Sequence, residues 1–269
     1  MQIIKNSEMD SRETAVKAVF FDIDGTLVSF KTHTVPPSAV KAIKALQEKG
    51  IKVIVATGRS IKAIDHIRYL NFDGFITFNG GYCVANDGRL LLRKAIDPTD
   101  IQRLLDHTTH HFALMYEKDV FISHVTPEIA GMYAHLNLPV PPLMNRERTD
   151  VTNVLQANIF MPPDKELEFM KNVMPNSLAT RWTPLFADVN PGGSSKKVGV
   201  EIFCDHFGFD ASETMSFGDG GNDISMLMQT GIGVAMGNAN KNVKEIADFI
   251  TTDTDTDGVF NALVHYNVI

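Results

Sequence analysis

Apolar residues over positions 17–82 fall into short continuous runs separated by segments of helical periodicity. Ala18–Phe21 (AVFF) and Lys52–Ala56 (KVIVA) are almost entirely apolar, which is typical of strands buried on both faces of a parallel sheet. Between them, residues 36–50 begin with two prolines, carry apolar residues at helical spacing and end at Gly50. This segment predicts a helix, so the three elements form a βαβ unit.

The same alternation continues along the chain and returns near its C-terminus. Residues 60–70 predict a second helix, and residues 74–81 a third strand that ends in a glycine-rich turn. Later helices are expected at 195–208, 222–231, 239–248 and 258–266, and strands at 213–219, 232–237 and 249–252. This alternation predicts an α/β protein with a doubly wound, Rossmann-like parallel sheet.

The middle of the chain follows a different pattern. Strand-like stretches lie close together there, with helical segments between them, at 89–95, 112–118, 120–125, 154–161 and 177–182. The second and third are nearly contiguous, as in antiparallel hairpins, and prolines at 138–143 indicate a loop. We expect a polar N-terminal extension, a core domain and an inserted α+β domain, formed by residues 1–16, by 17–82 with 188–269, and by 83–187.

Composition and charge narrow the class of protein. The 269 residues carry a formal net charge of −7, which does not favour binding to nucleic acid or to an anionic membrane surface. The sequence has no apolar run long enough for a membrane span and no signal-peptide segment at its start. Cys83 and Cys204 lack metal-ligand spacing and are too few for a disulfide framework. These features predict a cytoplasmic protein.

Two carboxylates mark the end of the first strand. A period of two puts Asp22 and Asp24 on the same side of an extended segment, while Ile23 points away. Carboxylates that face one spot repel each other unless a cation or a shared proton lies between them. A strand-terminating turn is an equally good interpretation of this stretch alone, because Asp and Gly are common in turns.

Two further clusters lie next to expected helices. Thr57 and Gly58 follow the second strand, so a hydroxyl and backbone N–H groups are available to bind an anion there. A helix cap formed by Thr57 or Ser60 is the simpler interpretation. Lys196 and Lys197 begin another helix, where the helix dipole disfavours a cation unless an anion or solvent compensates it. Most lysines in such positions are only solvated.

The fourth cluster follows the strand expected at 213–219. Asp219 and Asp223 flank two glycines and Asn222. Glycines let the backbone pass close to a ligand or an ion, and carboxylate oxygens suit Mg²⁺. Because ligand sites in open α/β sheets form at the carboxyl ends of the strands, we expect the four clusters to converge.

The order of the clusters resembles a known superfamily. The set consists of DIDGT (22–26), TGR (57–59), a lysine followed three residues on by a glycine (Lys196 to Gly199), and GDGGND (218–223). This order, placed at strand ends, is similar to that of the haloacid dehalogenase (HAD) superfamily. The resemblance covers nearly all of the chain from Lys17 onward.

Narrower features resemble one subfamily of that group. The large insertion between the second and third clusters, with NGG at 79–81, is similar to Cof-type proteins with a type C2 cap. The stretches 181–190 (RWTPLFADVN), 213–227 (ETMSFGDGGNDISML) and 232–239 (IGVAMGNA) resemble bacterial hexose-phosphate phosphatases. The resemblance implies a Mg²⁺-dependent phosphatase of small phosphorylated metabolites, most of all sugar phosphates.

The resemblance also implies roles for individual residues. Asp22 would attack phosphorus and form an aspartyl-phosphate, and Asp24 would protonate the leaving group and then deprotonate water. Mg²⁺ would be held by Asp22, Asp24, Asp219 and Asp223, with Asp24 contributing its backbone carbonyl. The phosphoryl oxygens would be bound by Thr57, Gly58, Lys196 and Asn222. Lys196 fits the family spacing better than Lys197 does.

Other interpretations stay open at this point. A second aspartate argues against a dehalogenase, and the lack of membrane spans argues against a P-type ATPase. A phosphosugar mutase of the same superfamily and a non-catalytic phosphosugar-binding protein are the alternatives. A binding protein would need neither a nucleophile nor an acid, so the pair Asp22 and Asp24 favours an enzyme. We expect a small phosphorylated molecule as partner, no nucleic acid or membrane, and a monomer or weak homo-oligomer.

Three stretches carry weaker signals. Arg181 and Trp182 are candidates for binding a sugar, although a buried tryptophan beside a surface arginine is the commoner arrangement. Residues 106–111 (DHTTHH) lack a partner at zinc-ligand spacing, which favours a solvated helix face. Residues 251–257 (TTDTDTD) lack the glycine and the final glutamate of a calcium loop, which favours a solvated loop.

Overall fold

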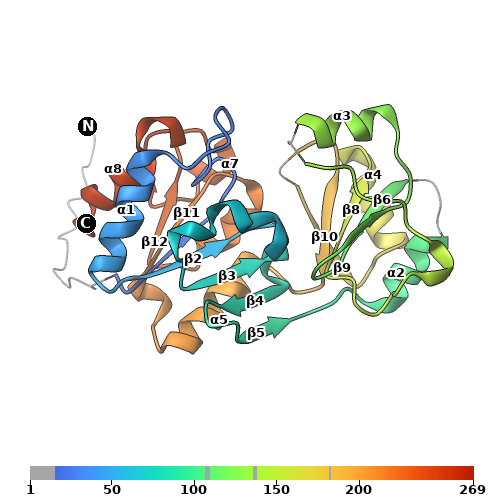
Figure 1. The fold of residues 1–269 in the computed structure, drawn as a ribbon, viewed down its shortest axis with the longest axis horizontal. Coiled ribbons are helices and arrows are strands. Elements are labelled where there is room, and N and C mark those ends of the chain that lie inside the picture. Colours follow the sequence, from blue (N-terminus) through green and yellow to red (C-terminus); the bar gives the residue numbers. More distant parts are fainter. Residues whose placement is uncertain (1–15, 107–109, 136–137, 182) are drawn as a thin grey trace, which may run out of the picture.

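The protein folds into two lobes, each built on its own sheet (Figure 1). The computed structural model describes residues 16–106, 110–135, 138–181 and 183–269. The core lobe contains an eight-stranded sheet of order β13-β12-β11-β1-β2-β3-β4-β5. Its strands are β1 (Ala18–Phe21), β2 (Lys52–Ala56), β3 (Gly74–Thr77), β4 (Tyr82–Ala85), β5 (Leu90–Arg93), β11 (Thr214–Gly218), β12 (Ile232–Ala235) and β13 (Phe249–Ile250).

Helices cover both faces of this sheet. Its α-helices are α1 (Pro37–Glu48), α5 (Lys196–Phe207), α6 (Ile224–Leu227), α7 (Lys241–Lys244) and α8 (Gly258–His265). Side chains alternate along β1, so that Val19 and Phe21 pack with α1 and α8, whereas Ala18 and Phe20 pack with α5. Because β1, β2, β3, β11, β12 and β13 run parallel, the predicted doubly wound α/β fold is confirmed.

Several expected α-helices differ in type or length. Residues 61–70 form a 3₁₀-helix, η1 (Ile61–Leu70), instead of an α-helix. The apolar residues of η1 recur every third position, which places them on one face of a helix with three residues per turn. The helices expected at 222–231 and 239–248 contain four α-helical residues each, in α6 and α7. Short 3₁₀ segments complete the lobe: η2 (Phe78–Gly80), η4 (Ala211–Glu213), η5 (Gly221–Asp223) and η6 (Thr254–Thr256).

Two strands from the region expected to be inserted belong to the core sheet. β4 pairs antiparallel with β3, and β5 pairs antiparallel with β4. The expected boundary at residue 83 therefore falls inside β4, and the chain leaves the core sheet after Arg93. The sequence does not predict β4 as a separate strand, because only the turn at η2 and Gly81 separates it from β3.

The second lobe, which we call the cap lobe, runs from Ile96 to Pro191. Its sheet has five antiparallel strands in the order β7-β6-β8-β10-β9. The elements are α2 (Pro98–Asp106), β6 (His111–Met115), β7 (Val120–Ile122), α3 (Pro127–His135), η3 (Arg146–Arg148), β8 (Gln156–Phe160), α4 (Pro163–Asn172), β9 (Ser177–Thr180) and β10 (Ala187–Pro191). Helices α2 and α4 pack on one face and α3 on the other.

The predicted hairpin in the cap lobe is confirmed, since β6 and β7 pair antiparallel. The sequence does not predict β10, because Asp188 and Asn190 stand at its buried positions where an apolar residue would mark a strand. The expected boundary at residue 187 falls on the first residue of this strand.

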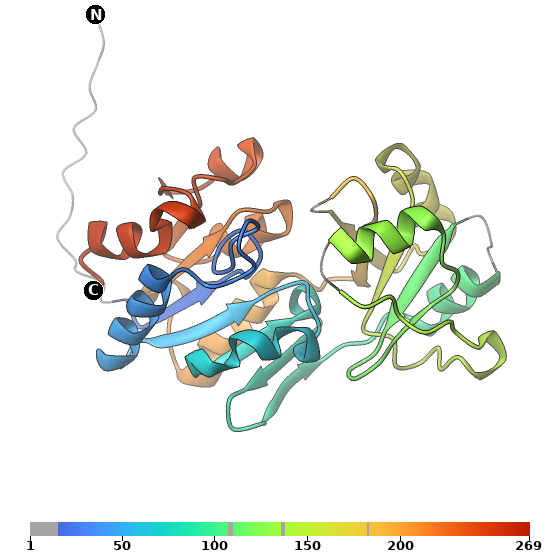
Figure 2. The same ribbon diagram turned by 45° about the horizontal axis from the view of Figure 1, so that its top comes forward.

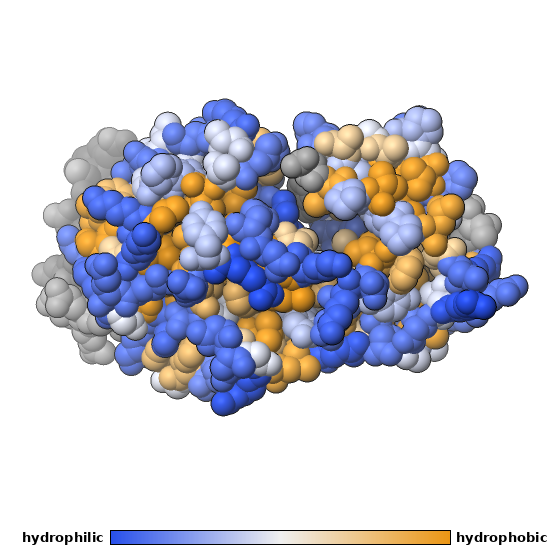
Figure 3. Space-filling view, in the orientation of Figure 1, coloured by the Kyte–Doolittle hydropathy of each residue, from blue (hydrophilic) through white to orange (hydrophobic). Residues whose placement is uncertain are grey.

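Two short segments, residues 94–95 and 192–195, connect the lobes. The Lys94 ammonium donates a hydrogen bond to the Gly192 carbonyl oxygen at 2.6 Å, which joins one connection to the other. Figure 2 shows the lobes side by side from a second direction, and the space-filling view shows a hollow between them (Figure 3). Within the described ranges, no helix has the length and apolar character to span a membrane.

Candidate active site

The carboxyl ends of β1 and β11 bring together residues from the two ends of the chain. These strands are adjacent and parallel over four residue pairs. Asp22 directly follows β1, and Asp219 directly follows β11. Together with Asp223 they form a group of three carboxylates whose candidate ligand atoms lie within 4.8 Å of one another. The first and fourth sequence clusters therefore meet at one edge of the sheet.

Lys196 reaches this edge from the start of α5. Its ammonium lies 2.6 Å from an Asp22 oxygen and 2.5 Å from an Asp223 oxygen, and its side chain is fully buried. Lys197 is half-exposed and lies 3.6 Å from Glu201 on the same helix. Of the two candidate lysines, only Lys196 contacts the carboxylate group.

Backbone N–H groups hold the second aspartate of the GDGGND loop. One Asp223 oxygen accepts hydrogen bonds from the N–H groups of Asp219 and Gly220, each at 2.9 Å. A β-carbon at Gly218 would lie 2.5 Å from the Asp223 β-carbon, so glycine is needed for this close return of the loop. The Asp219 carboxylate accepts a hydrogen bond from the Thr26 hydroxyl at 3.0 Å.

Burial and neighbouring charges raise the pKa of two of the three carboxylates. Burial, and next the charge of Asp223, raise the pKa of Asp22 to about 7. Burial, and next the charge of Asp22, raise the pKa of Asp219 to about 9. Burial alone would lower the pKa of Lys196, but the adjacent Asp22 and Asp223 outweigh it and the net shift is upward.

If all three carboxylates were ionised, together with the one ammonium of Lys196 they would carry a net charge of −2. A divalent cation would compensate that charge and restore the ionised forms of the acids. Hard oxygen ligands of this kind fit Mg²⁺. The side chains present therefore suit a divalent metal site.

A turn after β1 carries the chain against Asp219. Gly25 has φ +84°, and a β-carbon there would lie 2.4 Å from an Asp219 oxygen. Both facts require glycine. The Gly25 carbonyl accepts hydrogen bonds from the Asn238 amide at 2.8 Å and from the Thr254 hydroxyl. Thr254 is buried, so the segment 251–257 is not wholly solvated as expected, because it supports this turn.

Asp24 lies outside the group of three carboxylates and pairs with Arg59. The Nε and Nη2 atoms of Arg59 each donate to a different Asp24 oxygen, both at 2.6 Å. The extended pattern that would direct both aspartate side chains to one spot is wrong here. The strand ends at Phe21, and residues 23–28 form a turn in which Val28 N–H bonds to the Ile23 carbonyl.

Asn79 connects the other predicted anion-binding residues. Its side-chain oxygen accepts a hydrogen bond from the Asn222 amide at 3.0 Å, and its N–H donates to the Thr57 carbonyl at 3.0 Å. A β-carbon at Gly58 would lie 3.1 Å from the Asn79 amide nitrogen. That nitrogen is buried and has no hydrogen-bond partner among the described residues. Thr57, Gly58 and Asn222 therefore meet around one asparagine.

The helix cap considered for Thr57 is provided by Ser60, whose hydroxyl accepts a hydrogen bond from Ala63 N–H. Thr57 is buried, and its hydroxyl accepts a hydrogen bond from Arg59 N–H at 3.1 Å. Sequence reasoning assigned no role to Arg59 or Asn79, although both lie inside quoted stretches. Their positions in the motifs TGR and NGG could have marked them as site residues. No spacing rule, however, indicates which distant residue each of them contacts.

The cap-lobe residues considered for sugar or zinc binding either make structural contacts or lie partly outside the residues that the structure describes. Arg181 pairs with Glu166 and donates to two backbone carbonyls. Its side chain is only 15% exposed, so the expectation of a surface arginine is wrong. Trp182, and residues 107–109 of the stretch 106–111, lie outside the described residues.

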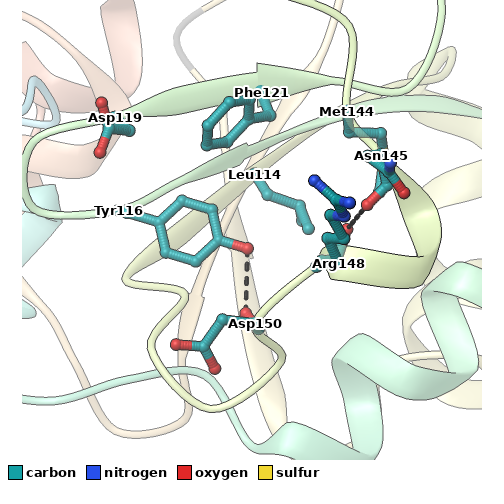
Figure 4. A pocket seen from close by; sticks show the side chains of 9 residues that line it. Leu114, Tyr116, Asp119, Phe121, Met144, Asn145, Arg148 and Asp150 are labelled. Carbon is teal, nitrogen blue, oxygen red and sulfur yellow. Dashed lines mark hydrogen bonds between the residues drawn. The ribbon is translucent and has the colours of Figure 1, made fainter.

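A separate hollow of about 330 Å³ lies within the cap lobe (Figure 4). The Tyr116 hydroxyl at its wall donates to the Asp150 carbonyl at 2.9 Å. The other lining residues are Leu114, Asp119, Phe121, Met144, Asn145, Arg148 and Thr149. None of the predicted site residues lines it, so the candidate active site is the carboxylate group of the core lobe.

The fold and the carboxylate group at its strand ends define an α/β protein with a site suited to a divalent metal, and comparison with known proteins gives the family. A family model described as haloacid dehalogenase-like hydrolase matches residues 19–263. The chain therefore belongs to the haloacid dehalogenase-like hydrolase family. The predicted superfamily is confirmed.

Similar proteins narrow the class to phosphatases. The chain is 37% identical to BT1666 of Bacteroides thetaiotaomicron, described among the phosphatases of this superfamily, with a TM-score of 0.90 over 98% of this chain and 100% of that one. It is 37% identical to BT4131, described as a sugar phosphatase of HAD subclass IIB, with a TM-score of 0.86 over 94% and 100%.

A sequence relative points the same way. The chain is 30% identical to the 5-amino-6-(5-phospho-D-ribitylamino)uracil phosphatase YcsE of Bacillus subtilis, over 93% of this chain and 96% of that one. The protein is thus a Cof-type phosphatase of the HAD superfamily, which sets aside the non-catalytic alternative. Phosphatases of this superfamily generally use a divalent metal, in keeping with the carboxylate group.

Proposed function

We propose that the protein is a Mg²⁺-dependent phosphatase of small phosphorylated metabolites, with hexose phosphates as its main substrates. The observation that carries the proposal is the group of three carboxylates, Asp22, Asp219 and Asp223, two of which pair with the buried Lys196. It combines a nucleophilic carboxylate, a cation and an uncompensated charge at the strand ends where such sheets bind ligands.

In this proposal the reaction has two halves. An Asp22 oxygen attacks phosphorus and forms an aspartyl-phosphate, while the bond between phosphorus and the leaving oxygen breaks. Asp24 gives its proton to that oxygen. A water molecule then attacks the aspartyl-phosphate and passes a proton to Asp24, which releases inorganic phosphate and restores both aspartates.

Asp22 and Asp219 would hold Mg²⁺ through their carboxylates and Asp24 through its backbone carbonyl, with Asp223 completing the site. When bound, the ion neutralises negative charge on the transferring phosphoryl group. Lys196 supplies a second positive charge from its buried position between Asp22 and Asp223.

Thr57, Gly58 and Asn222 would bind the phosphoryl oxygens opposite the metal. Asn79 accepts one hydrogen of the Asn222 amide at 3.0 Å, which leaves the second hydrogen available for a phosphoryl oxygen. Donors fixed before the substrate arrives stabilise developing charge without the cost of reorganisation.

The likeness to a sugar phosphatase supports hexose phosphates as the substrate class. A chain segment at the exit of β9 lies over the site, since a β-carbon at Gly221 would be 3.5 Å from the Arg181 carbonyl oxygen. This proximity supports a division of roles in which the cap lobe contacts the leaving group and the core lobe holds the phosphate.

A substrate panel tests the proposal. Phosphate release is measured for hexose, pentose, nucleotide, flavin and pyridoxal phosphates, with Mg²⁺ and with EDTA. We expect turnover only with the metal, with the highest kcat/KM for hexose phosphates. Asp22→Asn removes the nucleophile at nearly constant shape, and we expect it to lower kcat by at least about 1,000-fold.

Lys197→Met is the matched control, because Lys197 is half-exposed and contacts Glu201 instead of the site. It is expected to keep wild-type activity. Full activity of Asp22→Asn, or turnover that EDTA leaves unchanged, contradicts the proposal. Conversion of a hexose 1-phosphate into a 6-phosphate faster than its hydrolysis, followed by ³¹P NMR, would identify the mutase instead.

A further inference from the structure

Arg59 and Asp24 form the second charged centre of the site, apart from the carboxylate group. We propose that Arg59 is a positioning residue: its guanidinium fixes the orientation of the Asp24 carboxylate and so the direction in which Asp24 exchanges protons. The inference rests on the proposed function, in which Asp24 is the acid and base.

The geometry of the pair constrains rotation as well as position. Two different nitrogens of Arg59 donate to the two oxygens of Asp24, each at 2.6 Å. A single hydrogen bond leaves a carboxylate free to turn about its Cβ–Cγ bond, whereas a planar fork that holds both oxygens fixes the carboxylate plane. Lysine, with one point charge, has no equivalent of this contact.

Arg59 is itself held in place by the loop that carries Thr57. The Arg59 N–H donates to the Thr57 hydroxyl at 3.1 Å, and the Arg59 carbonyl accepts a hydrogen bond from Phe78 N–H at 3.1 Å. The Nη1 atom also donates to the Ala63 carbonyl at 3.4 Å. The fork therefore projects from a backbone fixed on both sides, next to a predicted phosphate-binding residue.

The two cations of the site are divided between different carboxylates. Lys196 contacts Asp22 and Asp223, while Arg59 is the one residue in an ion pair with Asp24 in the described part of the chain. The side chains of Arg59 and Asp24 are 26% and 30% exposed. Ion pairs with that access to solvent contribute at most about 1 kcal/mol to stability, so fold stability alone does not account for this arrangement.

The pair also matches the course of the proposed reaction. When Asp24 has given its proton to the leaving oxygen, it is a carboxylate, which is the form that a guanidinium binds. The same carboxylate then accepts a proton from the attacking water. Arg59 therefore holds Asp24 in place between the two halves of each turnover.

A double-mutant cycle tests the inference. The wild type, Arg59→Ala, Asp24→Asn and the double variant are compared by kcat/KM for glucose 6-phosphate with saturating Mg²⁺. We expect Arg59→Ala to lower kcat/KM by about 10- to 100-fold. Most of this loss should be in kcat, with KM changed less than about threefold. In the Asp24→Asn background the same change should cost less than about twofold, because a residue that acts through Asp24 has nothing left to position.

Equal losses from Arg59→Ala in both backgrounds would overturn the inference, since Arg59 would then act on the phosphate or on the fold. Wild-type activity of Arg59→Ala would overturn it as well. If Asp24→Asn itself kept full activity, the proposed role of Asp24 would fail instead, so the two failures are distinguishable.

The leaving group gives an independent readout that a purely structural effect would not move. Nitrophenolate departs without protonation, so the loss of kcat/KM caused by Arg59→Ala should be smaller for p-nitrophenyl phosphate than for glucose 6-phosphate. We expect the two losses to differ by at least about fivefold. Equal losses on both esters contradict the inference. Lys52→Ala is the control for loss of an ion pair, because Lys52 pairs with Asp73 at 2.8 Å at the opposite end of β2; it should keep wild-type kcat/KM.

Discussion

At Asp219, several unfavourable terms act on one side chain. Burial and the charges of Asp22 and Asp223 disfavour its ionised form. The groups that donate hydrogen bonds to it, the Thr26 hydroxyl and the Asn238 amide, are neutral. In the metal-free protein its pKa is raised from 3.8 to about 9. The site is therefore built for ligand binding at the expense of stability, as is common where charge is concentrated for chemistry.

This arrangement makes the metal-free stability depend on pH. A raised folded pKa means that the folded protein binds the proton more tightly, so the stability contributed is present below about pH 4 and is lost as pH rises toward 9. Asp219→Asn cannot ionise at this position, so it should not lose stability in this way as pH rises. In EDTA, its free energy of unfolding relative to wild type should increase by at least about 1 kcal/mol between pH 5 and pH 8, measured by urea denaturation.

Mg²⁺ should reverse the order of the two proteins at pH 8, because the wild type binds the cation in its folded state and the variant lacks one ligand. The comparison with wild type cancels the titration of the carboxyl groups that do not interact with Asp219. In EDTA, the difference in unfolding free energy between Asp219→Asn and wild type could also stay constant from pH 5 to pH 8. That result would show that the ionised Asp219 is not destabilised by its surroundings.

Single residues of the site differ in how well the sequence predicts them. Asp22, Asp219 and Lys196 follow or begin regular elements, and parallel strand order then brings them together. The contact of Asp24 with Arg59 depends on a turn that rotates one side chain away from its neighbour, and no spacing pattern encodes that rotation. The sequence therefore predicted that charged side chains meet at the strand ends. It did not predict that Asp24 leaves the carboxylate group and forms a second charged centre with Arg59.

At the level of elements, helix α5 is placed by a close approach to the sheet. A β-carbon at Gly199 would lie 2.3 Å from the Ile76 Cγ2 atom of β3. Because Lys196 lies one turn earlier on the same helix, the packing at Gly199 determines how deep the ammonium reaches.

Gly199→Ala should therefore affect both stability and activity. Overpacking against Ile76 is expected to lower the free energy of unfolding by about 1 to 3 kcal/mol, and the displaced Lys196 should lower kcat. Gly131→Ala in α3 is the matched control, since nothing lies within 4 Å of the added carbon. There, a better helix former should raise stability by up to about 1 kcal/mol. Similar effects of the two substitutions would contradict this account of α5.

The elements that the sequence predicts best are those with one clear apolar pattern. The continuous runs of β1 and β2 give strands with the expected bounds. In η1 the apolar spacing of three residues fits both an α-helix and a 3₁₀-helix, so the type was decided by packing. In β10 the buried Asp188 contacts Asn158 at 2.5 Å, and a polar pair inside a sheet has no apolar signature.

For the molecule as a whole, the two connections between the lobes set how the cap lobe sits over the core. The Lys94 hydrogen bond to the Gly192 carbonyl is a side-chain contact between them. Gly193, which follows, has φ +75°. Motion of one lobe against the other would pass through these few residues.

Lys94→Met should loosen this link and keep the length of the side chain. One exposed hydrogen bond contributes about 1 kcal/mol, so we expect KM for glucose 6-phosphate to rise about two- to fivefold. The free energy of unfolding should change by less than about 1 kcal/mol. Steady-state kinetics and urea denaturation measure the two effects. A fall in kcat of more than tenfold with unchanged KM would show that Lys94 affects the chemistry itself.

The order of strands in the core sheet also governs how the protein is made. β1 lies between β2, which leaves the ribosome soon after it, and β11, which leaves only after the whole cap lobe. All described strands of the cap lobe come from residues 111–191, so this lobe can fold before β11 is synthesised. Until then, one edge of the apolar strand β1 in the core sheet is unpaired. Nascent chains stalled before residue 214 should therefore contain a folded cap and be prone to aggregate through that edge. Asp219 and Asp223 follow the cap lobe in the chain, so the group of three carboxylates can assemble only after the whole cap lobe has been synthesised.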